Sequence, residues 1–173
     1  KAHTFKPLYG GMSGTEDEKK YYYSFLNKYS DISHWHDILQ SNAIEFKVIQ
    51  IPTGREYAFP YAERMPWGGS NYSTQIKNYP VQGLATADIV PIACIEIHRL
   101  MKNNNTKSVL INTVHDSIIA DVYPNEVELM KKIFKEGTDS VHTILKKNYN
   151  LDFNVPLDTE LKIGDNWLDM YTP

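Results

Sequence analysis

A histidine and an aspartate, His115 and Asp116, interrupt a run of apolar and β-branched residues, and this placement favours metal chemistry. The flanking residues 109–114 and 118–122 have the composition of strands, so the pair is predicted to form the tip of a hairpin. A carboxylate that two strands hold in place suits a hard cation, because Mg²⁺ prefers anionic oxygen ligands at fixed distances. The alternative is an ordinary hairpin in which Asp116 only forms the turn.

The first ten residues hold a second set of side chains, which suits a nucleotide. Lys1, Phe5 and Tyr9 recur at intervals of four and would share one face of a helix. A lysine can meet a phosphate as a point charge, and an aromatic ring one turn further on can stack on a sugar or a base. An amphipathic helix with a solvated lysine explains the same spacing, and Pro7 would kink it.

Two amides four residues apart form a third set. Asn78 and Gln82 lie in the stretch Asn-Tyr-Pro-Val-Gln-Gly, directly before a long apolar segment, and are expected at a helix entry. Amides both donate and accept, so these side chains suit the minor-groove acceptors that all base pairs share. The simpler alternative is that Asn78 caps the helix.

Composition limits the classes of protein to consider. Hydrophobic residues make up 42% and charged residues 23% of the 173 residues, which indicates a globular chain long enough for a core. The net charge of −3 does not indicate a nucleic-acid binder, but a local basic groove would suffice for one. The single cysteine, Cys94, excludes an internal disulfide and a cysteine-rich zinc site. No membrane span or signal peptide is predicted, so a cytoplasmic protein without membrane contact is expected.

The elements that must position these side chains alternate between helical and extended segments. Thr15 and Glu18 predict a capping box at the start of the first full helix. The further predicted elements are a helix to residue 39 with a bend near 30–31, a hairpin over 46–60 that turns at 52–54, a loop over 61–73, an apolar helix over 82–101 that contains Pro91, a hairpin over 108–123, a helix over 125–147 interrupted at Gly137, and an edge strand over 153–163. This order predicts an α+β fold.

Together these motifs resemble the C-terminal part of a family A DNA polymerase, the group of bacterial DNA polymerase I and many phage replicases. Residues 1–10 resemble the nucleotide-binding helix of the fingers, and residues 78–83, followed by Asp88, resemble the motif that opens a palm helix. Residues 114–116 resemble the catalytic palm hairpin, and the stretches 155–157 and 164–167 resemble the C-terminal ending of the family. The four landmarks occur in the order of the family and span essentially the whole chain.

The resemblance implies the C-terminal part of a polymerase right hand. Residues 1–66 would belong to the fingers, and residues 67–173 to the palm, with the catalytic hairpin at 108–123. The implied activity is template-directed DNA synthesis, in which the primer 3′-hydroxyl attacks the α-phosphate of a dNTP with the help of two metal ions. The implied cofactor is Mg²⁺, and the implied partners are dNTP and primer-template DNA.

The resemblance also assigns roles on the nucleotide side. Lys1 would contact the incoming triphosphate and protonate the pyrophosphate leaving group, which makes it a catalytic residue together with Asp116 and His115. Phe5 would pack against the incoming sugar. Tyr9 would sit beside the templating position and help to close the pocket.

On the DNA side, the resemblance implies that Asn78 and Gln82 follow the minor groove of the primer-template, that His115 approaches the primer end, and that Asp116 binds Mg²⁺. Arg55, in the turn 53–55, resembles a Gly-Arg pair of the family that contacts the nucleic-acid backbone. A solvated surface arginine explains Arg55 equally well.

The chain departs from the family pattern at several positions. Ser117 stands where the family usually has Glu, Thr74 where an Arg is common, and Lys6 where Gly is usual. We therefore expect metal binding to depend less on the second hairpin position. The other catalytic Asp of the family lies before the Lys1 motif, so this chain would hold half of a two-carboxylate site. An N-terminal polymerase portion is expected, as a separate chain or a missing segment.

Two alternatives remain. A fragment of a single-subunit phage-type RNA polymerase would share the palm hairpin, although Phe5 and the stretches 78–83 and 164–167 favour the DNA enzymes. A non-catalytic DNA-binding subunit of a replisome is also conceivable, although the retained Lys1 and Asp116 argue against it.

Overall fold

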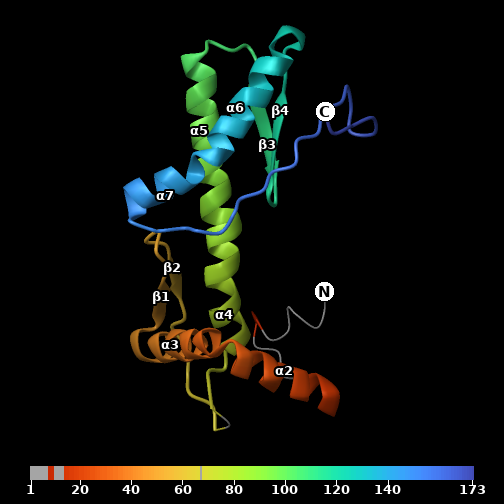
Figure 1. The fold of residues 1–173 in the computed structure, drawn as a ribbon. Helices are drawn as coiled ribbons and strands as arrows, with labels where there is room; N and C mark the ends of the chain where they lie inside the picture. Colours follow the sequence, from red (N-terminus) through yellow and green to blue (C-terminus); the bar gives the residue numbers. More distant parts are fainter. Residues whose placement is uncertain (1–7, 10–13, 67) are drawn as a thin grey trace. The chain divides into compact units, whose positions relative to one another are not determined.

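The computed structural model describes residues 8–9, 14–66 and 68–173 (Figure 1). Lys1 and Phe5 lie outside the described residues, so of the three side chains assigned to the nucleotide only Tyr9 is described. The elements are α2 (Glu16–Lys28), α3 (Ser30–Phe46), β1 (Val48–Gln50), β2 (Glu56–Ala58), α4 (Ser73–Gln82), the π-helical segment η1 (Gly83–Ile89), α5 (Val90–Asn103), β3 (Val109–Val114), β4 (Ser117–Asp121), η2 (Pro124–Glu126), α6 (Val127–Asp139) and α7 (Val141–Tyr149). Helices with two antiparallel hairpins confirm the predicted α+β class.

The chain forms two compact units, the N-terminal unit Lys1–Leu84 and the C-terminal unit Ala85–Pro173. The predicted division into fingers and palm between residues 66 and 67 stays a prediction, because a compact unit need not coincide with a functional subdomain. Each unit has a hydrophobic core of its own.

The N-terminal unit begins with the predicted capping box, which the structure confirms. The Thr15 hydroxyl accepts from the Glu18 amide at 3.3 Å, and the Glu18 carboxylate accepts from the Thr15 amide at 2.8 Å. The expected bend is a break at Tyr29 between α2 and α3. The hairpin β1–β2 also forms as predicted, with Gly54 at a φ of 86° in its turn.

The core of the N-terminal unit joins α3, α4 and the hairpin β1–β2. Its buried members are Leu39, Ala43, Ile49, Phe59, Ala62 and Ile76. Ile76, fully buried on α4, fixes the helix that carries Asn78 and Gln82. The positions of these two amides therefore depend on the packing of this core.

The C-terminal unit is built around α5, which packs against α6, α7 and the hairpin β3–β4 (Figure 1). One cluster comprises Ile97, Leu100, Met101, Met130 and Ile133, and a second comprises Ile92, Ala93, Val141 and Leu145. Ile118 of β4 packs against both clusters. The hairpin is thus held by the same core that joins the helices. Cys94 on α5 is half-buried, and burial raises the pKa of its thiol.

The apolar helix begins earlier than predicted. Helix α4 starts at Ser73, so Asn78 and Gln82 lie inside a helix and not at its entry, and Tyr72 occupies the N-cap in place of Asn78. The following turns over Gly83–Ile89 are π-helical. Pro91 offers a physical reason, because it has no N–H for the carbonyl four residues earlier and its ring crowds that carbonyl.

Two other predictions in the C-terminal unit are wrong. The interruption of the last helix falls at Ser140, while Gly137 lies inside α6. The predicted edge strand over 153–163 does not form; in the described tail only Ile163 and Tyr171 make an isolated bridge. Phe153 and Leu157 instead pack against the cluster of α5 and α7, which satisfies their apolar surface without a strand partner.

The helical residues Ser73–Asn103 are long and apolar enough to cross a membrane by length and composition, which the sequence analysis did not predict. The buried core helix of a soluble protein passes the same test, so this is weak support for a span. Ile76, Ile92 and Ile97 of this stretch belong to the hydrophobic clusters, and 33% of its most apolar window is buried.

Candidate active site

His115 and Asp116 form a two-residue turn between the paired residues Val114 and Ser117, as predicted. Of the two, only His115 has a positive φ, of 55°. That position favours glycine, and a left-handed conformation costs another residue about 1 kcal/mol. The residue directly before Asp116 is therefore held in a mildly strained conformation by the turn.

The structure leaves the side chain of Asp116 exposed at this tip. No hydrogen bond or ion pair joins it to another of the described residues. Its carboxylate oxygens are therefore accessible to a ligand from solution. The paired strands and the short loop hold the Asp116 backbone in place, which is the arrangement that a metal ligand needs.

A bulge in β3 sets the orientation of the hairpin. Leu110 pairs with Ala120 and Asn112 with Ile119, so Ile111 is the extra residue. Side chains on a regular strand alternate between its two faces. The extra residue shifts this alternation, so two residues three positions apart on β3 lie opposite residues on the core-facing side of β4. The bulge therefore lies between the anchored base of the hairpin and its tip.

The base of the hairpin is fixed by Glu126, which directly precedes α6. Its carboxylate accepts from the Lys107 and Ser108 amides, each at 2.9 Å, and from the Ser108 hydroxyl at 2.6 Å. The Ser108 hydroxyl in turn accepts from the Tyr123 amide at 3.0 Å. These bonds lower the pKa of Glu126, the Ser108 hydroxyl first, and they join both strands of the hairpin to the start of α6.

The donor set around the tip suits one half of a magnesium site. Mg²⁺ is commonly held by one or two carboxylates together with waters and substrate phosphates. Asp116 supplies one such carboxylate, and its neighbour Ser117 supplies none. Within the described part of the chain, no group of three His, Cys, Asp or Glu side chains could hold a metal by itself. The residues present therefore fit a metal that other groups help to hold.

On α4, Asn78 and Gln82 lie one turn apart, as their spacing requires. The Asn78 Oδ1 atom is buried and has no hydrogen-bond partner among the described residues. Gln82 is exposed, and its Nε2 donates to the phenol oxygen of Tyr9 at 3.2 Å. The structure thus brings together Tyr9 and Gln82, which the sequence assigned to two separate motifs.

Gly83, which follows Gln82, has a packing role. A Cβ at this position would overlap the hydroxyl of Tyr57 on β2. The glycine therefore allows the end of α4 to lie against the hairpin β1–β2. Arg55, in the turn of this hairpin, is exposed, as a contact with nucleic acid would require.

The sequence analysis missed a buried polar pair, His36 on α3 and Lys77 on α4. His36 is 3% exposed and Lys77 6% exposed. Burial, and then the charge of Lys77, lower the pKa of His36 to about 4, whereas the backbone of Leu8 and the carboxylate of Asp37 oppose this shift. Burial also lowers the pKa of Lys77, against the effect of Asp37. The spacing of His36 with the buried Leu39, Gln40 and Ala43 was the available signal.

The buried His36 predicts an acid-sensitive fold. The unfolded state takes up a proton near pH 6.5 and the folded state only near pH 4, so unfolding binds protons between these values. The contribution of His36 is complete above pH 6.5 and is lost as the pH falls toward 4, by about 3 kcal/mol in total. We expect His36→Gln to remove about 2 kcal/mol of the stability difference between pH 7.5 and 5, measured by urea denaturation. His98→Gln, at an exposed position, should retain the full difference. An unchanged difference in His36→Gln would contradict the prediction.

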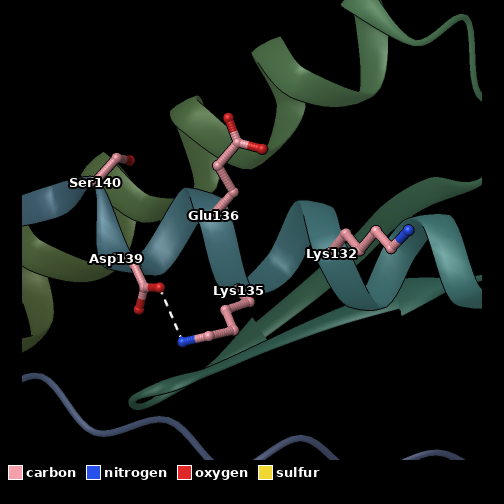
Figure 2. A pocket seen from close by; sticks show the side chains of 5 residues that line it. All are labelled: Lys132, Lys135, Glu136, Asp139 and Ser140. Atoms are coloured by element: carbon pink, nitrogen blue, oxygen red, sulfur yellow. Dashed lines mark hydrogen bonds and ion pairs between the residues drawn. The ribbon is translucent and has the colours of Figure 1, made fainter.

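A shallow pocket on α6 is a weaker candidate for a catalytic site than the hairpin tip. Lys132, Lys135, Glu136, Asp139 and Ser140 line it (Figure 2). Lys135 is paired with Asp139 at 2.9 Å, and the Ser140 hydroxyl donates to the Gly137 carbonyl at 2.9 Å. Its two ammonium groups and two carboxylates balance in charge. The hairpin tip is the better candidate for catalysis.

Comparisons with known proteins agree with the motifs. Residues 11–169 match the family model described as DNA polymerase family A. The DNA polymerase I of Chloroflexus aurantiacus is 32% identical over 93 residues, which cover 54% of this chain and 9% of the relative. The DNA polymerase of Bacillus phage SP01 is 23% identical over 163 residues, which cover 93% and 17%. The chain thus spans less than a fifth of the length of these relatives.

A solved structure described as the "POL domain of Pol1 from M. smegmatis complex with DNA primer-template and dNTP" has a similar fold. The TM-score is 0.69 at 19% sequence identity, and the likeness covers 81% of this chain and 26% of that chain. At this identity the comparison supports the fold alone.

Proposed function

Because the chain belongs to DNA polymerase family A, we propose that it is the C-terminal part of a DNA-directed DNA polymerase. The reaction is nucleotidyl transfer from a dNTP to a primer 3′-hydroxyl on a DNA template. The observation that carries the proposal is Asp116, which is exposed and has no partner among the described residues, at the tip of a hairpin that the core and Glu126 hold in place. The Pol1 domain of similar fold is described in complex with primer-template and dNTP, which supports these as partners.

In this proposal the two units contribute different contacts. In the C-terminal unit, Asp116 would hold Mg²⁺ and His115 would approach the primer end. A bound pair of metal ions would stabilise the charge on the entering and leaving oxygens. In the N-terminal unit, Asn78, Gln82 and Arg55 would follow the DNA.

The nucleotide side of the proposal rests on three residues. Tyr9 would close the pocket beside the templating position. Lys1 would bind the triphosphate and give a proton to the leaving pyrophosphate, and Phe5 would pack on the sugar. A lysine can carry out the proton transfer because its ammonium group is both a phosphate ligand and an acid.

We also propose that an N-terminal polymerase portion, on a separate chain or a preceding segment, supplies the second catalytic carboxylate. The single carboxylate at the tip and the small share of each relative that the chain spans support this. The hairpin β3–β4 is a two-stranded sheet that leaves Val109, Ile111 and Val114 exposed by 52%, 58% and 44%. A covering portion would bury this exposed apolar surface. The setting of such an enzyme would be the cytoplasm.

Primer extension tests this proposal. We expect the chain alone to extend a primed template no faster than background, and the chain joined to or mixed with its N-terminal portion to incorporate dNTPs. Robust extension by the lone chain would refute the need for the partner. Preferred incorporation of rNTPs would favour a phage-type RNA polymerase, and DNA binding without extension by the complete assembly would favour a non-catalytic subunit.

A further inference from the structure

Leu8 and Tyr9 lie near two helices of the N-terminal unit. From α4, the Gln82 amide donates to the phenol oxygen of Tyr9 at 3.2 Å. From α3, the buried ring of His36 interacts with the backbone of Leu8. The bond from Gln82 is therefore a direct contact between the end of α4 and the end of the Tyr9 side chain.

We propose that Gln82 is a positioning residue for Tyr9, in addition to any contact of its own with DNA. This inference rests on the proposed function, in which Tyr9 helps to close the nucleotide pocket. The amide of Gln82 holds the phenol at the end of α4, and therefore sets where the aromatic ring lies when a nucleotide arrives. Removing the amide removes this bond without removing any group that touches the nucleotide.

The end of α4 is a firm support for such a role. Ile76 and Pro80, which precede Gln82 on the helix, are buried. Gly83, which follows it, lies so close to the Tyr57 hydroxyl that a side chain would not fit. Gln82 itself is exposed, so its amide extends from a fixed backbone toward Tyr9. A positioning residue needs this combination of an anchored main chain and a polar end that reaches its partner.

The energetic scale follows from the type of bond. Loss of a neutral hydrogen bond changes an equilibrium constant by roughly fivefold on average. We therefore expect Gln82→Leu to raise the KM for dNTP about fivefold in the complete polymerase. Because an amide in the minor groove contributes separately to DNA affinity, that variant alone cannot tell positioning from DNA contact.

The variant Gln82→Glu separates the two roles. A carboxylate of the same length accepts a hydrogen bond from the Tyr9 phenol, so the ring stays in place. The same negative charge is repelled by the DNA backbone, so the affinity for primer-template falls. Positioning therefore predicts a near-normal KM for dNTP at saturating DNA together with a raised Kd for DNA. Gln75→Leu, at an exposed site on the same helix, is the control.

The contact itself can be observed without catalysis. With 3-fluorotyrosine incorporated throughout the chain, the ¹⁹F resonance of Tyr9 is identified by its absence in Tyr9→Phe. We expect Gln82→Leu to shift and broaden this resonance, and Gln82→Glu and Gln75→Leu to leave it close to its original position.

An unmoved Tyr9 resonance in Gln82→Leu would overturn the inference, as would a KM for dNTP raised equally by the Leu and Glu variants. These results are distinct from failure of the proposed function. If the complete polymerase does not extend primers, the proposed function is wrong, while the ¹⁹F spectra still decide whether Gln82 positions Tyr9.

Discussion

Asp116→Asn is expected to lower the rate of primer extension by the complete polymerase by roughly a thousandfold, equivalent to about 4 kcal/mol of transition-state stabilisation. Asn preserves the size of the side chain but removes the negative charge, and Mg²⁺ binds anionic oxygens far more strongly than an amide. The side chain makes no internal hydrogen bond or ion pair with the described residues, so the substitution should leave the fold unchanged.

The matched control is Asp121→Asn, which removes an exposed carboxylate from the other end of β4. We expect this variant to retain extension within about twofold, since surface substitutions of this kind rarely matter. Single-turnover extension and fluorescence anisotropy with labelled primer-template would separate chemistry from DNA binding. Equal extension by the two variants would rule out Asp116 as the metal ligand. A large loss of DNA affinity in Asp116→Asn would point to a binding role instead.

The hairpin that carries this residue was predictable because its signal is local. Two β-branched runs around a polar pair predict strands and a turn without knowledge of their surroundings. The bulge at Ile111 and the positive φ of His115 were not predictable. Both depend on how the hairpin must twist to place Leu110 and Ile118 on the core of α5 and α6.

The helix that carries Asn78 and Gln82 was harder to delimit from the sequence. Tyr72 at its N-cap makes no side-chain hydrogen bond that a capping pattern could reveal, and Pro80 inside the helix suggests a boundary that does not exist. Lys77 and His36 are buried because of the way α3 and α4 face each other. Such pairings of distant segments leave no periodic signal in either segment. The contact of Gln82 with Tyr9 was unpredictable for the same reason.

The glycine in the last helical region shows how tertiary packing reverses a local rule. Glycine ordinarily weakens a helix, so an interruption at Gly137 was the natural prediction. In the structure the helix continues through this residue, because the absence of a side chain allows α6 to approach α5 at Ile97.

Gly137→Ala is therefore expected to destabilise the protein by about 2 kcal/mol, although the same change in an exposed helix stabilises by up to about 1 kcal/mol. An added Cβ would clash with Cγ1 of Ile97 and would lie only 3.2 Å and 3.3 Å from its backbone nitrogen and Cα. The backbone cannot move without separating α5 from α6, whose shared cluster also supports the hairpin. Urea denaturation would measure the change, with Lys132→Ala on the exposed face of α6 as a control expected within about 0.5 kcal/mol of the parent.

The double variant with Ile97→Ala tests the cause. Ile97→Ala removes the atom that clashes and costs roughly 3 kcal/mol by itself through the cavity it leaves. In that background the new Cβ at residue 137 partly fills the cavity, so Gly137→Ala should cost at least about 1 kcal/mol less than in the parent. Additive losses would show that the two residues are not coupled, and a stabilised Gly137→Ala would show that the helices tolerate the added methyl group. If the two substitutions are coupled in this way, the shared cluster that holds the hairpin and Asp116 requires α5 and α6 to approach closely at Gly137.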